Sequence, residues 1–232
     1  MGGVSATPNG TSHLSGTSES TRMSGPRLVD DLLRYLQEGR DGLLGALDGL
    51  DDYDVRRPMT PSGTNLLGLV KHVAGVQLAY LADSVGRPSS ERLPWVEDGS
   101  IWESADMWAT AEESRADLVG LYERAATHCD AVVRELGLGA PASVAWWPEE
   151  RRTTTLGSLL VRCVAEVSHH AGHADILRES IDGRGGRDHD DMGGDAWWSD
   201  YLARIQAAAD AHRTVPAADA HGTVPAAGGA GS

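Results

Sequence analysis

Several residue types are rare in this sequence, and the scarcity of cysteine narrows the kinds of site to expect. Phenylalanine is absent, lysine occurs only at position 71, and the 232-residue chain has two cysteines. Cys129 and Cys163 belong to no CxxC pair and stand in helical patterns, so we expect small core residues and no disulfide framework or zinc knuckle. The excess of alanine, glycine and arginine is typical of codons rich in G and C.

Positive charge and long apolar runs are also scarce. The formal net charge is -14 and no stripe of arginine and lysine is visible, so we expect no binding to a nucleic-acid backbone. Charged or polar residues interrupt every apolar stretch within about a dozen positions. Residues 1–20 have no apolar signal core. These absences predict a soluble, cytoplasmic protein without a membrane partner.

The ends of the chain differ in composition from its centre. Residues 1–25 are rich in glycine, serine and threonine, and residues 211–232 are rich in alanine, glycine and proline. Neither segment can bury enough apolar surface to offset the entropy lost on ordering, so both are predicted to be disordered tails. One domain is therefore expected, over residues 26–210.

The central region has apolar residues at intervals of three and four, which is the period of an amphipathic helix. Alternation typical of strands is not found. The prediction is an all-α four-helix bundle followed by a short C-terminal helix. The predicted helices cover residues 27–50, 64–85, 104–137, 155–182 and 195–209.

Two long connections between the predicted helices are rich in tryptophan. Trp95 and Trp102 lie in residues 86–103, and Trp146 and Trp147 lie in residues 138–154. Aromatic loops at the end of a bundle either cover a cleft or plug the core, and the sequence leaves both roles open.

Residues 166–176, EVSHHAGHADI, bring three histidines and a glutamate together on the fourth long helix. At about 100° per residue, Glu166, His170 and His173 lie on the side of the apolar stripe, whereas His169 lies at its edge. A carboxylate and two imidazoles that point into a helical core are unfavourable unless they are paired, hydrogen-bonded or bound to metal. This pattern predicts a metal site.

The second helix offers another ligand. In LLGLVKHVAGV, His72 lies on the apolar face. A lone histidine on such a face is usually a satisfied core residue, but a histidine cluster on a facing helix makes metal ligation the better interpretation. Residues 182–195 are acidic but lack the ligand spacing of a calcium loop, so a flexible connector is predicted there.

Four segments carry a family resemblance. They are MTPSGTNLLGLVKHVAGVQ, the Asp-Met-Trp at the start of the third helix, HHAGHADILRESIDG and DAWWSDYLARI. Together they resemble the DinB-like superfamily, and most closely its actinobacterial mycothiol-transferase-like branch, over about residues 27–208. The resemblance implies an antiparallel four-helix bundle, often a homodimer, whose divalent metal is held by one residue of the second helix and two residues four apart on the last.

By this resemblance His72 is the ligand on the second helix, and the pair on the last helix stays open. His169 and His173 match an HxxxH form, whereas Glu166 and His170 match the ExxxH form of mycothiol-dependent isomerase relatives. The helical positions favour Glu166 and His170, keep His173 as a further candidate and rank His169 last. Zinc is the expected metal, and nickel, iron and manganese are the alternatives.

The resemblance also implies an enzyme that uses a low-molecular-weight thiol. A metal with open positions can deprotonate a bound thiol near neutral pH, which creates a nucleophile without a protein cysteine. We therefore expect transfer of a thiol, mycothiol, to an electrophilic small molecule. The alternatives are an isomerase or hydrolase and a non-catalytic metal-binding stress-response module. Arg162, Trp102 and Asp83 are candidate substrate contacts, and the acidic balance argues weakly against an anionic substrate.

Overall fold

The computed structural model describes residues 25–184 and 189–213, so most of both predicted tails lies outside the described residues. Its contacts divide the chain into one unit that ends at Arg184 and a C-terminal unit. The second unit contains α8 (His189–Met192) and α9 (Asp195–Asp210), the predicted short helix. The helical class is confirmed, and every helix in the described ranges is too short or too polar to span a membrane. The single domain over 26–210 stays a prediction.

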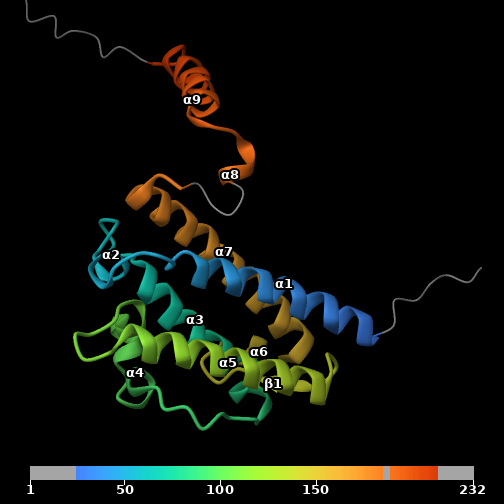
Figure 1. The fold of residues 1–232 in the computed structure, drawn as a ribbon. Coiled ribbons are helices and arrows are strands. Elements are labelled where there is room, and N and C mark those ends of the chain that lie inside the picture. The colour runs from blue at the N-terminus through green and yellow to red at the C-terminus, as the bar shows by residue number, and fades with distance from the viewer. Residues whose placement is uncertain (1–24, 185–188, 214–232) are drawn as a thin grey trace, which may run out of the picture. The chain divides into compact units, whose positions relative to one another are not determined.

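Four long helices build the first unit (Figure 1). They are α1 (Gly25–Gly45), α3 (Leu66–Leu81), α5 (Arg115–Leu136) and α7 (Leu156–Asp182). The most extensive packing joins α1 to α7, α3 to α5, and α3 to α7. Gly42 brings α1 close to α7, because a Cβ at this position would lie only 3.3 Å from the Cβ of Ala171. The apolar side chains between these helices form one buried core.

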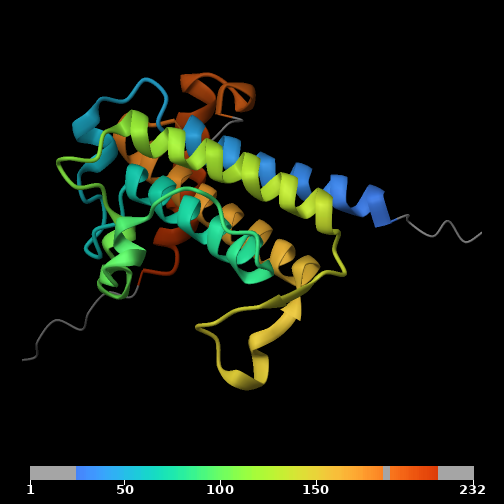
Figure 2. The same cartoon turned by 90° about the horizontal axis from the view of Figure 1, so that it is seen from below.

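The helices of each close pair run in the same direction. Beyond the C-terminal end of α1, the carbonyl of Ala46 accepts a hydrogen bond from Arg178 near the end of α7, at 3.1 Å. Arg87, after α3, pairs with Glu135 at the end of α5, at 3.1 Å. The long connection over residues 82–114 returns the chain so that α5 can run alongside α3, as Figure 2 shows. Antiparallel packing therefore occurs between the two pairs and parallel packing within them.

The third long helix begins later than predicted. The prediction placed its start at residue 104, but α5 begins after Ser114, whose side chain caps it. Ser104 has a left-handed backbone with φ of 63° and Trp108 is extended, so one helix cannot run through both. The connections contain α2 (Asp52–Arg56), η1 (Asp83–Val85), α4 (Pro94–Glu97), η2 (Ser100–Glu103) and η3 (Ala105–Met107).

The connection before α7 contains two strands, so the expectation of no strands was wrong. β1 (Pro141–Ser143) pairs with β2 (Thr153–Thr155) in an antiparallel hairpin, with α6 (Glu149–Arg152) between them. Three residues per strand are too few for an alternating pattern to be visible in a sequence. Figure 2 shows this hairpin extending from one end of the four helices.

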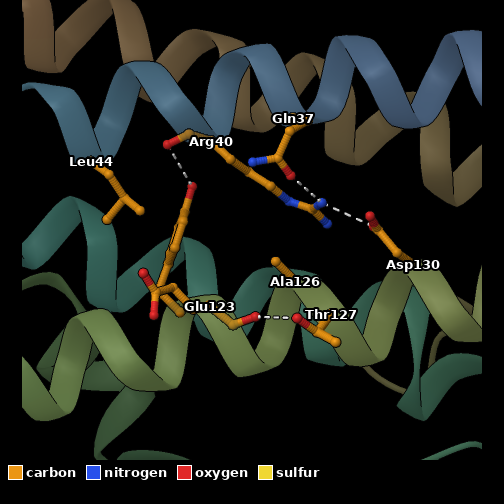
Figure 3. Close-up of a pocket in the computed structure, with 8 residues that line it drawn as sticks. Gln37, Arg40, Leu44, Glu123, Ala126, Thr127 and Asp130 are labelled. Atoms are coloured by element: carbon orange, nitrogen blue, oxygen red, sulfur yellow. Dashed lines mark hydrogen bonds and ion pairs between the residues drawn. The ribbon is translucent and has the colours of Figure 1, made fainter.

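A buried arginine joins α1 to α3 and α5. Arg40 is 1% exposed, and its Nε donates to Oε1 of Gln77 at 2.7 Å. Its Nη1 donates to Oε1 of Gln37 at 3.1 Å and lies 2.9 Å from Oδ1 of Asp130, as Figure 3 shows in the pocket between α1 and α5. A guanidinium is tolerated inside a protein when it is paired and hydrogen-bonded in this way. The network therefore fixes how α1, α3 and α5 are positioned along one another at Arg40.

The first turn of α3 binds the connection that leads to α5. Asn65 caps the helix, because its Oδ1 accepts the backbone N–H of Gly68 at 2.7 Å. Its Nδ2 donates to the carbonyl of Met107 at 3.1 Å. A Cβ on Gly68 would lie 1.9 Å from that same carbonyl oxygen, so the backbone of the connection approaches too closely for any other residue.

We expect Gly68→Ala to lower the free energy of unfolding by about 1–3 kcal/mol, because the added methyl group displaces the connection at Met107. The matched control is Gly172→Ala in α7, where the added Cβ has no atom within 4 Å apart from those of its own stretch of helix. This control should be neutral or slightly stabilising, since alanine is the better helix former. Chemical denaturation followed by circular dichroism checks both variants, and equal stability of the two would contradict the close approach.

Candidate metal centre

Three of the predicted ligands meet where α3 packs against α7. Oε1 of Glu166 lies 3.7 Å from Nε2 of His72 and 3.4 Å from Nε2 of His170. One donor atom from each side chain lies within 4.8 Å of the other two. In the described part of the chain, no other group of three histidine, cysteine or acidic side chains comes this close together. The structure thus brings two imidazoles and one carboxylate to a single point.

Local structure explains this convergence. Glu166 and His170 are four residues apart on α7, so they project from the same face of the helix. The Asn65 cap fixes where α3 begins and therefore which of its residues face α7. The rings of His72 and His170 meet edge to face with centroids 4.9 Å apart.

The donor set fits zinc or a similar divalent cation. Metal–ligand bonds of about 2.0–2.1 Å in a tetrahedron separate neighbouring ligand atoms by about 3.3–3.4 Å. The distances from Oε1 of Glu166, 3.4 and 3.7 Å, are close to this separation. Burial lowers the pKa of His170 below its ordinary value and the nearby His72 adds to the effect, which favours the neutral ring that a metal requires. Two imidazoles and one carboxylate leave a coordination position for a small molecule.

Asp106 belongs to this site and was not predicted as a site residue. Its Oδ2 lies 2.6 Å from Nδ1 of His72, and the residue is only 8% exposed. A carboxylate in this position accepts a hydrogen bond from Nδ1–H of His72. The unprotonated Nε2 then faces Glu166 and can bind a metal. The only signal in the sequence is the Asp-Met-Trp motif, since helical periodicity cannot reveal a contact made from a 3₁₀ turn in another part of the chain.

The two other histidines of the cluster lie outside the triad. His173 is exposed, and its ring centroid is 5.5 Å from that of His170. His169 is also exposed, as its position at the edge of the apolar stripe predicts. The triad therefore contains the ExxxH pair, while ligation by His169 or His173 stays a prediction.

The predicted substrate contacts occupy different places. Nη2 of Arg162 lies 4.0 Å from Oε2 of Glu166, so this side chain borders the triad. Trp102 is 78% exposed in η2, and Asp83 is exposed in η1, where partial shielding of its carboxyl group from water raises the pKa of that group. Of the loop tryptophans, Trp95 is buried and plugs the core, whereas Trp146 is 44% exposed. Substrate contact by Trp102 and Asp83 stays a prediction.

Both cysteines are buried core residues without a disulfide, as the sequence predicts. Burial raises the pKa of Cys129 to about 12 and raises the pKa of Cys163 strongly as well. Neither thiol ionises near neutral pH, and the chain has no third cysteine. The protein therefore offers a metal-ligand set without an ionised thiol of its own.

Fold and site together define a mainly helical protein with a histidine and carboxylate centre between two of its long helices. The sequence profile of the family described as Mycothiol-S-transferase matches residues 31–183, well over half of the chain. The protein belongs to this mycothiol-S-transferase family, which confirms the predicted mycothiol-transferase branch. No curated protein matches the sequence. His72, Asp106, Glu166 and His170 all lie within the matched range.

We expect Asp106→Asn to weaken zinc binding about 10–100-fold, because the acceptor of the Nδ1–H hydrogen bond of His72 is then a neutral amide and no longer a charged carboxylate. The control is Glu103→Gln, which removes the same charge from an exposed position of the same connection. Competition with a chromogenic chelator measures both affinities. Equal zinc affinity in the two variants would show that Asp106 has no part in the centre.

Replacement of the two adjacent histidines should separate the ExxxH and HxxxH pairs. We expect His170→Ala to lose most of its bound metal, because Nε2 of this ring faces Glu166, and His169→Ala to retain it, because that side chain is exposed. Atomic absorption of the purified proteins gives the metal content per chain. The reverse order would assign the site to His169 and His173.

Proposed function

We propose that this protein is a metal-dependent thiol S-transferase, which joins mycothiol to an electrophilic small molecule. The observation that carries the proposal is the triad of His72, Glu166 and His170 in a chain of the mycothiol-S-transferase family. We further propose that α1, α3, α5 and α7 form the four-helix bundle of the DinB-like superfamily. Family membership supports the transferase class, and the donor set supports the use of a metal.

In this proposal His72, Glu166 and His170 hold a divalent ion, with zinc expected first. The ion, when bound, would supply a Lewis acid that lowers the pKa of a thiol. Asp106 keeps the proton of His72 on Nδ1, and the lowered pKa of His170 keeps that ring neutral. His173, whose ring lies 5.5 Å from His170, is a further proposed ligand.

The proposed reaction forms one carbon–sulfur bond. The thiol of mycothiol releases its proton to solvent, and an electron pair of the sulfur bonds to the electrophilic carbon. At a saturated carbon or an activated aromatic carbon the leaving group departs with its bonding pair, and at an activated double bond the displaced pair takes up a proton. The buried thiols of Cys129 and Cys163 have raised pKa values, which supports a small molecule as the source of the sulfur.

The zinc-loaded protein should consume electrophiles such as monobromobimane or chlorodinitrobenzene faster with mycothiol than without a thiol, and mass spectrometry should identify the S-conjugate. We expect His72→Ala to lower kcat/KM by more than about a hundredfold, because the metal loses a ligand. His128→Ala, in α5, is the control, since its ring bonds to the carbonyl of Arg87 and not to the triad.

Two results would contradict the proposed function. One is purified protein that binds no divalent metal, and the other is conjugation that is unchanged in His72→Ala. A product that contains no sulfur, formed by hydrolysis or isomerisation, would instead favour an isomerase or hydrolase built on the same centre. Tightly bound metal without any turnover would favour a non-catalytic module.

A further inference from the structure

Arg162 differs from several other exposed arginines of this acidic protein in having no close carboxylate partner. Five of them have a carboxylate oxygen within 3.1 Å, namely Arg34, Arg87, Arg92, Arg124 and Arg134. Arg162 is 45% exposed, and its nearest carboxylate oxygen, Oε2 of Glu166, is 4.0 Å away, beyond hydrogen-bond distance. Its N–H groups, of which a guanidinium has five, are therefore available to a ligand.

Two aromatic rings hold the guanidinium in place. Cζ of Arg162 lies 4.9 Å from the ring centroid of Tyr80 and 5.8 Å from that of Trp147. The indole N–H of Trp147 donates to the hydroxyl of Tyr80 at 3.3 Å, and Tyr80 is buried. This arrangement restrains the arginine before any ligand arrives, so less side-chain entropy is lost on binding.

Glu166 connects this arginine to the candidate metal centre. Its Oε1 faces the Nε2 atoms of both His72 and His170, and its Oε2 faces Arg162. Arg162, Glu166 and His170 are spaced by four residues and form one stripe along α7. A group bound to the guanidinium of Arg162 therefore lies next to the triad, separated from the two histidines by the carboxylate of Glu166.

On the basis of the proposed function, we infer that Arg162 binds a carboxylate of the electrophilic co-substrate. A planar guanidinium recognises a carboxylate through two parallel hydrogen bonds, which also orient the bound molecule. The substrate class is then a small carboxylic acid whose electrophilic carbon lies a few bonds from the carboxylate. The acidic balance of the whole chain argues weakly against an anionic ligand, but at this position the positive charge of Arg162 has no carboxylate within hydrogen-bond distance.

A pair of unreactive ligands tests this subsite in the full-length, zinc-loaded protein. We expect 3-phenylpropionate to bind more tightly than 3-phenylpropionamide in isothermal titration calorimetry. Arg162→Gln should weaken carboxylate binding by at least about tenfold and change amide binding by less than about twofold. Arg162→Lys should fall between, because it keeps the charge and loses the planar donor pair.

Arg134→Gln is the matched control, because it removes the same charge from another exposed arginine. It should bind both ligands as the parent does. The inference is overturned if Arg162→Gln binds the carboxylate like the parent, if it weakens both ligands equally, or if it loses its zinc, since the last result would mean that Arg162 only positions Glu166.

The same titrations separate this inference from the proposed function, because they require no thiol and no turnover. Carboxylate binding that depends on Arg162, in a protein without conjugation activity, would leave the subsite standing and reject the transferase. Conjugation of an acidic electrophile with the same KM in the parent and in Arg162→Gln would reject the subsite alone.

Discussion

The ammonium group of Lys71 is buried where α3 meets the connection that leads to α5. It donates to the carbonyl of Trp108 at 3.0 Å and to Oε2 of Glu113 at 2.8 Å, and the residue is 2% exposed. A buried ammonium without such partners costs on the order of several kcal/mol. The next residue of α3 is His72, and its carboxylate partner Asp106 lies in the same connection. One buried charge therefore holds the connection in place and, with it, the orientation of a candidate ligand.

α7 contributes residues both to the apolar core and to the candidate metal centre. Cys163, Val167 and Ala174 are fully buried and contribute to the apolar core. Glu166 and His170 stand between these core positions in the sequence but turn toward α3. Leu159 and Leu177, seven residues before Glu166 and seven residues after His170, are buried on the same side of α7, so the polar pair interrupts the apolar stripe. The contacts of Glu166 with His72 and His170 mean that it adds no unpaired carboxylate there. The site thus lies at the edge of the packed interior, where its three side chains stay partly exposed.

Local periodicity explains which features could be predicted from sequence. Apolar spacing located the long helices, and the same geometry placed Glu166 and His170 on one face. The start of α5 was predicted too early, because the left-handed backbone of Ser104 that interrupts the predicted helix leaves no period in the sequence, whereas the local capping signal of Ser114 and Asp117 was not used. Asp106 was not predicted either, because it lies in a 3₁₀ turn and contacts His72, a residue 34 positions earlier in the sequence. Nonlocal contacts of irregular segments leave no period in a sequence.

The chain has no ionised cysteine, and this absence separates the proposed role of the triad from that of Arg162 beside it. Both cysteines are buried with raised pKa values, so the described side chains offer imidazole, carboxylate and guanidinium groups near the triad but no ionised sulfur. In the proposed reaction both partners are therefore small molecules, and the triad can activate a thiol without distinguishing one electrophile from another. Selectivity for the electrophile then depends on residues beside the triad. One of them is Arg162, which packs against the rings of Tyr80 and Trp147 with its hydrogen-bond donors available. A change of border residues could alter the substrate while the metal-ligand set stays the same.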